Sequence, residues 1–249
     1  MKTKLTLFVA VIGAAILGTG CNSLDKGLVA YYPFNGNYHD ESGNQKGGQA
    51  SSVTSITDRH GVSDSALSFL PRKNSYIEIP ESNSSPWANI QTVSVWVKMR
   101  VENNPEKGSE VVLRNYQDNT PSESGWTLHL LKHSNDNKTH IEWISKGRGG
   151  HRILCPIDNG EWFNLIVLNR EDSVDFYING AMMESQKASP SKKAPNGRSL
   201  LIGGFLEAES EAKGRFNGEI DDIRIYNRAL SAEEVKALYE LEKPKAKSP

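Results

Sequence analysis

The chain has 249 residues, enough for one large domain or two small ones. Its 29 Lys and Arg residues nearly balance its 30 Asp and Glu residues, and the net charge of −1 lacks the basic excess of nucleic-acid-binding proteins. The 5 Trp, 8 Tyr and 7 Phe residues, together with 21 Gly and 11 Pro, favour an all-β protein. Two cysteines exclude a disulfide-dense scaffold and a Cys-rich zinc site.

Residues 1–20 have the pattern of a signal peptide. Lys2 and Lys4 give a basic start, and the apolar run Leu5–Leu17 that follows is shorter than the ~20 residues that a membrane-spanning helix needs. Because Cys21 comes directly after this segment, it resembles a bacterial lipoprotein signal. That resemblance implies cleavage before Cys21 and lipidation of its thiol. A secreted protein cut nearby is the alternative.

Lipidation would anchor the protein without any spanning helix. Lipoproteins kept at the inner membrane have an Asp after the lipidated Cys, whereas this chain has Asn22. The same resemblance therefore implies that the protein is located at the outer membrane. Residues 21–26 are then the lipidated Cys and a short tether. Cys155 is left without a partner and lies in an apolar, strand-like run, which predicts a buried structural thiol.

Short alternating runs separated by turn formers fill the chain from Leu28 to about Tyr226, which is typical of a β-sandwich or jelly roll. The period-two pattern places Val93, Val95 and Val97 on one face of their strand. The predicted strands are 28–34, 66–69, 76–79, 93–101, 110–114, 126–131, 140–144, 152–155, 162–169, 174–178, 200–202 and 219–226.

Two local signals are sharper. Asn179 and Gly180 between apolar runs predict a type I′ hairpin. Ser231 followed by Glu234 predicts a helix N-terminus with a capping box. Apolar residues at helical spacing, namely Val235, Leu238, Tyr239 and Leu241, predict the buried stripe of this helix, with a flexible tail over 242–249.

An ordered set of motifs resembles the bacterial laminin-G-like domain of the concanavalin A-like lectin/glucanase superfamily. Gly27-Leu-Val-Ala-Tyr-Tyr-Pro-Phe-Asn-Gly-Asn opens it and Thr57-Asp-Arg-His-Gly follows. Val93-Ser-Val-Trp-Val-Lys comes later, and Glu219-Ile-Asp-Asp-Ile-Arg-Ile-Tyr-Asn-Arg-Ala-Leu-Ser closes it. The resemblance implies an all-β fold, an antiparallel two-sheet jelly-roll sandwich with one short C-terminal helix, over residues 27–241. It implies no single function, because this fold hosts lectins, adhesion modules and hydrolases.

The resemblance also implies a structural calcium ion. Many relatives use an acidic residue of the closing motif, which corresponds to Asp221, and Asn35 and Asp40 are further candidates near the first strand. Asp221 and Asp222 are adjacent, so they should point to opposite faces and only one should be a ligand. The alternative is an Asx-rich turn at residues 35–43, with one Asp paired to Arg224 or Arg228.

The closing motif is also similar to the Glu-x-Asp-x-x-Glu motif of laminarinase-type glucanases. Those enzymes need two carboxyl groups about 5 Å apart. Here Arg224 stands where the acid/base would be, and it cannot protonate a leaving group. A glycoside hydrolase is therefore the least favoured interpretation.

A glycan surface is the remaining candidate site. Strand alternation places Trp126 and Trp143 on apolar faces, which predicts core positions. The opposite polar faces carry the candidate ligand-binding residues Arg114, His129, Glu142 and Arg152. The alternatives are an ordinary solvated face or a rim site formed by the loops 103–109 and 117–124.

We therefore predict a non-enzymatic, lipid-anchored carbohydrate-binding or adhesion module of the bacterial cell envelope. Its expected partner is a polysaccharide or other glycan, and no nucleic acid is expected. A protein-interaction or structural module without a sugar site is the alternative.

Overall fold

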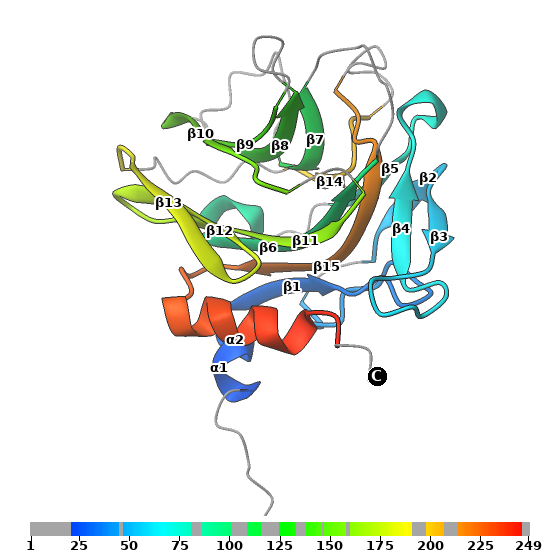
Figure 1. Cartoon of the computed structure of the whole chain (residues 1–249), viewed down its shortest axis with the longest axis horizontal. Helices are drawn as coiled ribbons and strands as arrows, with labels where there is room; N and C mark the ends of the chain where they lie inside the picture. Colours follow the sequence, from blue (N-terminus) through cyan, green and yellow to red (C-terminus); the bar gives the residue numbers. More distant parts are fainter. Residues whose placement is uncertain are drawn as a thin grey trace, which may run out of the picture.

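The computed structural model describes residues 21–44, 47–80, 86–100, 109–115, 125–132, 138–145, 147–157, 160–190, 198–206 and 214–245. Within them, strands form two sheets stacked face to face (Figure 1). Every pairing between named strands is antiparallel. The all-β jelly-roll prediction is confirmed.

Sheet A has eight strands among the described residues. The closing strand β15 is long enough to pair with β6 on one side and with both β4 and β1 on the other, so the first and last strands are neighbours. In spatial order the sheet runs β13 (Ala181–Lys187), β12 (Ser173–Ile178), β11 (Trp162–Asn169), β6 (Thr92–Met99), β15 (Gly218–Tyr226), β4 (Ala66–Phe69) and β3 (Thr54–Ile56), with β1 (Leu28–Tyr32) also on β15.

Sheet B has seven strands among the described residues. In spatial order it runs β10 (Gly149–Leu154), β9 (Thr139–Ser145), β8 (Trp126–Lys132), β7 (Ser109–Arg114), β14 (Leu200–Ile202), β5 (Tyr76–Ile79) and β2 (Gln49–Ser51). The main core fills the space between the two sheets. Trp126 and Trp143 lie there as predicted, with ring centroids 5.0 Å apart.

The predicted strands all exist, with ends shifted by a few residues. The hairpin prediction is confirmed, because Asn179 and Gly180 both have the positive φ that a type I′ turn requires. The short strands β2 and β3 were not predicted. Their side chains are mostly exposed or half-buried and polar, so they carry no apolar alternation. Two 3₁₀ helices, η1 (Pro71–Lys73) and η2 (Pro86–Asn89), lie in connections.

Helix α2 (Ala232–Glu242) has the predicted capping box at Ser231. It covers part of the outer face of sheet A and buries Val235 and Leu238 in a second apolar cluster with Ile166, Leu168 and Tyr226. The predicted stripe is wrong at one position. Leu241 is 59% exposed and Glu242, which the sequence assigned to the tail, is buried instead. Glu242 lies seven residues after Val235, which returns it to the same face of the helix.

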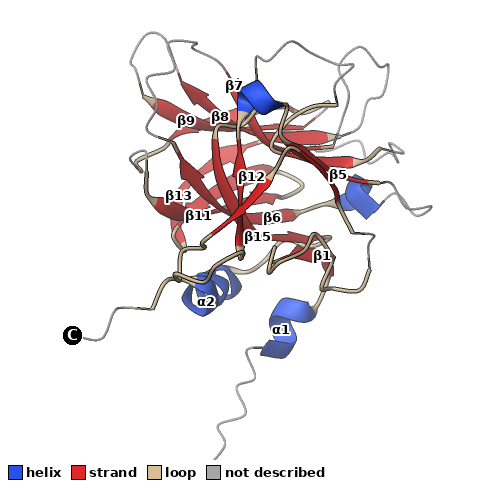
Figure 2. Cartoon of the chain, turned by 90° about the vertical axis from the view of Figure 1, so that its right-hand side faces the viewer, coloured by secondary structure: helices blue, strands red, loops and turns tan. Residues whose placement is uncertain are grey.

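Residues 21–25, which the sequence assigned to the lipidated Cys and a short tether, form a short helix, α1 (Cys21–Asp25). Figures 1 and 2 both place α1 beside α2, below sheet A. Within the described residues, no helix is long and apolar enough to cross a membrane. Cys155 is buried, as predicted.

Candidate functional site

The four predicted glycan-binding residues lie on consecutive strands of sheet B. Cross-strand pairing puts Arg152 opposite Glu142, and Glu142 opposite His129. Their chain neighbours Ile141 and Trp143 point into the core. Since side chains alternate along a strand, Arg152, Glu142 and His129 share the outer face of sheet B. The prediction that they share a polar face is confirmed; their role in ligand binding stays a prediction.

We call these side chains the polar row; it consists of two contacting pairs on neighbouring strands, Arg152 with Glu142 and His129 with Ser109. Arg152 Nη2 donates to Glu142 Oε1 at 2.8 Å, with the two side chains 39% and 13% exposed. At the other end of the row, Ser109 Oγ contacts His129 Nδ1. The row thus offers the Arg152 guanidinium, which donates hydrogen bonds, and the Glu142 carboxylate, which accepts them, whereas the Nε2 atom of His129 is buried.

Apolar side chains flank the polar row. On the neighbouring cross-strand row, His140 pairs with Leu154 on one side and with Leu131 on the other. Leu154 is 45% exposed. On the other flank, a Cβ on Gly150 would lie 3.2 Å from Glu142 Oε1, so the glycine leaves space beside the carboxylate. A polar row next to an exposed apolar side chain matches both the hydroxyl groups and the C–H face of a sugar.

Arg114 does not belong to this open surface. It lies on the same face, opposite Thr127 on β8, but it is only 2% exposed. Its guanidinium carbon lies 4.6 Å from the ring centre of Phe205, which follows β14. Arg114 is therefore buried beneath an aromatic ring, and its role in ligand binding stays a prediction.

The rim-site alternative falls largely outside the described residues. The segments 101–108 and 116–124 are not among them, and Ser109 is the first described residue after the former.

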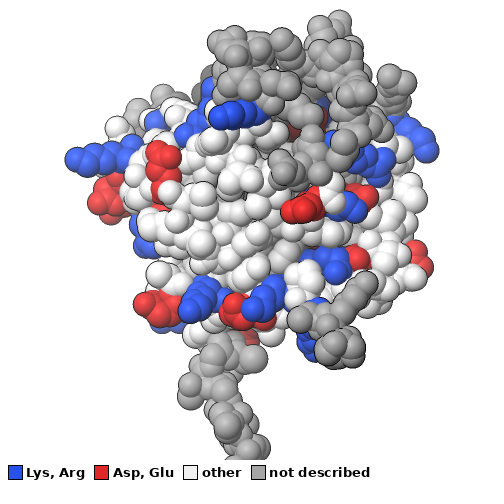
Figure 3. Space-filling model, viewed as in Figure 1, with Lys and Arg blue, Asp and Glu red and all other residues white. Residues whose placement is uncertain are grey.

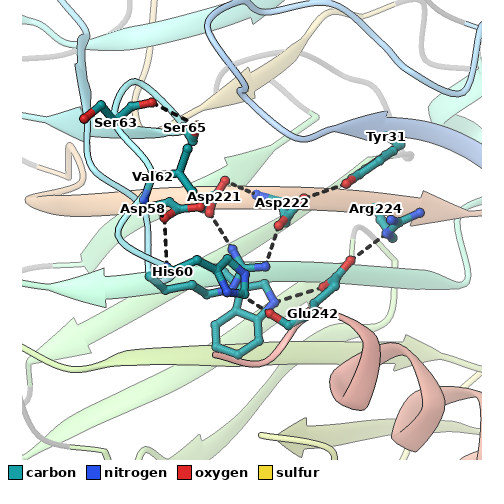
Figure 4. Close-up of polar contacts among 12 residues, drawn as sticks. Tyr31, Asp58, His60, Val62, Ser63, Ser65, Asp221, Asp222, Arg224 and Glu242 are labelled. Carbon is teal, nitrogen blue, oxygen red and sulfur yellow. Dashed lines mark hydrogen bonds and ion pairs between the residues drawn. The ribbon is translucent and has the colours of Figure 1, made fainter. Parts of the chain in front are cut away.

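The closing motif forms a different kind of cluster. Figure 4 shows Asp221 and Asp222 of β15, Tyr31 of β1 and Glu242 of α2 converging in one place. Arg59, from the loop after β3, donates from Nη1 to Asp221 and from Nη2 to Asp222, each at 2.5 Å. Its Nε donates to the Glu242 carbonyl at 2.9 Å. The Arg59 side chain is 1% exposed.

The prediction that Asp221 and Asp222 point to opposite faces is wrong. The register of β15 against β6 shifts between Asp221 and Arg224, and Asp222 has a φ of +40°. This bulge interrupts the strand alternation, so both carboxylates reach the same guanidinium. The suggested pairing of one Asp with Arg224 or Arg228 is also wrong, since those arginines pair with Glu242 and Glu234.

Burial dominates the ionisation of this cluster. It raises the pKa of Asp221 to about 8, and the neighbouring Asp222 charge adds to the effect while Arg59 opposes it. Burial also raises the pKa of Glu242 to about 7, against the lowering influence of Arg224 and Trp96. Trp96 Nε1 donates to Glu242 at 2.9 Å and Arg224 Nε donates to it at 2.6 Å.

The two carboxylates proposed for calcium both accept hydrogen bonds from protein groups. Asp221 accepts from Arg59, and Asp40 accepts from the backbone N–H groups of Tyr31, Ser42 and Asn44. Asn35 is exposed, and its carbonyl accepts from Asn37. Within the described part of the chain, no three His, Cys, Asp or Glu side chains are grouped to hold a metal. As placed, these residues fit an Asx-rich turn and a buried ion pair better than calcium coordination.

Charged residues of the glucanase-like motif are also held in ion pairs. Glu219 pairs with Lys98 at 3.0 Å, and Arg224 pairs with Glu242. Arg224 therefore occupies the position of the acid/base, and it lies in an ion pair on the outer face of sheet A.

Arg59 is the residue that sequence reasoning missed. It stands in Thr57-Asp-Arg-His-Gly, a motif quoted for the family resemblance but given no role. The charge pattern of the sequence could have indicated its role. The adjacent acids Asp221 and Asp222 lie in an apolar strand and need a cation when buried, and Arg59 is the cation of the Thr57-Asp-Arg-His-Gly motif.

The chain is similar to known proteins in both sequence and fold. The family model of the concanavalin A-like lectin/glucanases superfamily matches residues 71–236. Domain 4 of AbnA, an extracellular arabinanase from Geobacillus stearothermophilus in complex with arabinotriose, has a TM-score of 0.62 at 21% identity. The match covers 85% of this chain and 98% of that one.

Two toxin domains are also similar. The botulinum neurotoxin serotype D ligand-binding domain, in complex with N-acetylneuraminic acid, has a TM-score of 0.62 at 18% identity, covering 90% of this chain and 53% of that one. The binding domain of Paraclostridial Mosquitocidal Protein 1 has a TM-score of 0.64 at 19% identity, covering 87% and 52%. The chain thus spans about half of each toxin domain, and at these identities the likeness shows the fold.

Proposed function

The chain belongs to the concanavalin A-like lectin/glucanase superfamily, and on that basis we propose that it is a non-enzymatic carbohydrate-binding module of the bacterial cell envelope. The fold alone does not select this function, so the proposal depends on the site. The observation that carries it is the polar row on the outer face of sheet B, where Arg152, Glu142 and His129 lie side by side.

An oligosaccharide suits this surface chemically. Sugar hydroxyls donate and accept hydrogen bonds, and the row offers partners for both. Leu154 supplies exposed apolar area beside the row for the C–H groups of a sugar ring. The similar arabinanase domain and neurotoxin domain, crystallised with arabinotriose and N-acetylneuraminic acid, support a saccharide as the ligand class.

A binding role is favoured over catalysis by the closing motif. A retaining glycosidase needs two free carboxyl groups flanking the bond. Glu219 is paired with Lys98, and the second position holds Arg224. We therefore assign no catalytic residue.

The envelope location is proposed from Cys21 and the signal-like segment before it. Lipidation of this cysteine would hold the module at the outer membrane, with secretion as the alternative. A module held in this way would bind the cell to a polysaccharide.

A glycan array with the chain from Asn22 onward, in calcium and again in chelator, is the direct test. The double variant Glu142→Ala/Arg152→Ala should bind the glycan that gives the strongest array signal at least about tenfold more weakly, because it removes both partners of the ion pair in the polar row. The matched control is Glu240→Ala/Lys243→Ala, which removes a surface ion pair of 2.6 Å on α2. Unchanged binding by the first variant would contradict the assigned site.

A protein-binding module is the second candidate, favoured by the edge of sheet A. Met182 and Met183 on the edge strand β13 are 52% and 44% exposed. Figure 3 shows a broad area without Lys, Arg, Asp or Glu in the middle of this view. This function would be favoured over glycan binding by two results together. The folded protein would bind no glycan on the array, and it would capture a protein partner that the Met182→Lys/Met183→Lys variant does not capture.

A further inference from the structure

The segment that follows Cys21 is docked on the domain. Leu24 of α1 is 6% exposed and packs in the second apolar cluster with Leu230, Val235 and Leu238. Removing an apolar side chain from water is favourable, so the burial of Leu24 holds α1 on the domain.

Arg228 ties the backbone of the same segment down. Its Nη2 donates to the Ser23 carbonyl at 2.7 Å, and its Nε donates to the Lys26 carbonyl at 2.6 Å. Glu234 fixes this guanidinium from the other side at 2.7 and 2.9 Å. Charge-assisted hydrogen bonds of this kind are stronger than neutral ones.

Gly27 completes the docking. The Asn227 N–H donates to the Gly27 carbonyl at 3.0 Å. A Cβ on Gly27 would lie 2.8 Å from Asn227 Oδ1, and its φ of +74° also favours glycine. The chain therefore runs from α1 directly into β1 with its backbone against β15.

After the proposed cleavage, Cys21 and Asn22 would be the residues before the docked ones. Two residues reach at most about 7 Å when fully extended. A lipid on Cys21 would thus place the bilayer surface next to α1 and α2, with no spacer long enough for the domain to turn over.

The polar row lies on the other side of the molecule. Figures 1 and 2 place α1 and α2 against the outer face of sheet A, while β7–β10 of sheet B lie beyond the core. Two stacked sheets are about 10 Å apart and a helix adds about 10 Å more. The row is therefore on the order of 20 Å farther from Cys21 than α2 is.

We propose that the α1–α2 face of the anchored domain lies on the lipid bilayer, so that the polar row on sheet B is presented away from the membrane. This orientation depends on the proposed lipidation of Cys21. It gives the domain one fixed membrane-facing surface instead of free rotation on a tether.

The charge of the α1–α2 face is compatible with a lipid surface. Figure 3 shows basic and acidic groups alternating along its lower edge, where Figure 1 places α2. A surface without acidic excess is not repelled by anionic headgroups. Its exposed or half-buried charged residues are Lys26, Arg228, Lys236, Lys243 and Lys245 against Asp25, Glu233, Glu234 and Glu240.

Site-specific quenching in vesicles tests this orientation. The lipidated full chain would carry Cys155→Ala and one surface cysteine, either Lys236→Cys on α2 or Leu154→Cys on β10, each labelled with a fluorophore. In phosphatidylethanolamine/phosphatidylglycerol vesicles containing a headgroup-quencher lipid, the label at 236 should be quenched at least about threefold more than the label at 154. Intact mass reports separately whether Cys21 carries lipid.

A spacer variant is the matched control. Ten Gly/Ser residues inserted between Asn22 and Ser23 interrupt α1 after its second residue, but they keep the docking contacts of Ser23, Leu24 and Lys26 and add a mean reach of about 18 Å. The quenching ratio should then fall toward one. Lipidated protein with equal quenching at both positions, or a ratio unchanged by the spacer, overturns the orientation alone. Protein without lipid on Cys21 overturns the anchor and the orientation with it.

Discussion

Arg59 is the buried cation that both carboxylates of the closing motif share. Its guanidinium binds Asp221 and Asp222, and its carbon lies 4.3 Å from the ring centre of Trp96. Tyr31 hydroxyl also donates to Asp222 at 2.8 Å. Because buried carboxylates are costly unless they are paired, this one side chain makes the acidic closing motif compatible with burial.

Replacing Arg59 should therefore be severe. We expect Arg59→Ala to lower the free energy of unfolding by about 3–5 kcal/mol, since it leaves two buried carboxylates without their cation. Urea denaturation would measure the loss. Arg100→Ala is the control, because Arg100 is 28% exposed and its bonds to Ser68 and Glu219 are near the surface, so its loss should stay below about 1 kcal/mol. Similar losses for both variants would contradict the role of Arg59.

Glu242 should make stability depend on pH. Its pKa is raised from 4.5 to about 7, so between these values the folded chain keeps a proton that the unfolded chain has lost. The free energy of unfolding should then fall as pH rises through this window, by up to about 1.4 kcal/mol per pH unit for one proton. Asp222, Arg224 and Trp96 are the groups that face the carboxyl.

Glu242→Gln should flatten this dependence, and urea denaturation at pH 5, 6, 7 and 8 would show it. Some slope should remain, because the pKa of Asp221 is raised as well. Glu233→Gln on the exposed side of α2 should keep the parent slope. An unchanged slope in Glu242→Gln would rule out this carboxyl as the source.

The β12–β13 hairpin and α2 depend on each other. Gly180 lies beneath Tyr239 of α2, and a Cβ there would meet the ring at 2.9 Å. Tyr239 in turn stacks on Trp96, with ring centroids 5.9 Å apart. The turn that sets the hairpin register therefore also provides the surface on which the helix rests.

Gly180→Ala should cost about 2–3 kcal/mol, part from the positive φ and part from displacing Tyr239. Gly43→Ala is a matched control, because Gly43 has the same φ of +74° and a Cβ there would meet nothing within 4 Å, so only the backbone cost of about 1 kcal/mol applies. Thermal or urea unfolding would compare them. If Gly180→Ala and Gly43→Ala lowered the free energy of unfolding equally, Tyr239 and α2 would give way to the added methyl group without a measurable loss of stability.

The docking of α1 on α2 joins the two ends of the described chain. Leu24→Ala should therefore destabilise the whole domain by about 2 kcal/mol, at the low end of buried Leu→Ala changes because the site is near the surface. Leu241→Ala, at a leucine that is 59% exposed, should stay within about 0.5 kcal/mol. If both variants unfold at the same urea concentration, α1 is not part of the folded unit.

Local patterns could be predicted because they depend on residues close in the chain. The positive-φ turn at Asn179–Gly180, the capping box at Ser231 and the alternation that puts His129 outside and Trp143 inside all follow from neighbours a few positions apart. The jelly roll, in contrast, was implied by the family resemblance of an ordered set of motifs that spans the domain.

The partners of the charged residues were decided only by the tertiary structure. Arg59 meets Asp221 across 162 positions of sequence, Phe205 covers Arg114, and a bulge turns Asp222 toward the same cation as Asp221. Burial and pairing are properties of the assembled sheets, and they depend on which distant segments the sandwich brings into contact. The sequence alone therefore determined the longer strands and, where the alternation runs unbroken, the face that each side chain takes. The packed structure decided which of those faces are open to a ligand and which are closed by an internal ion pair.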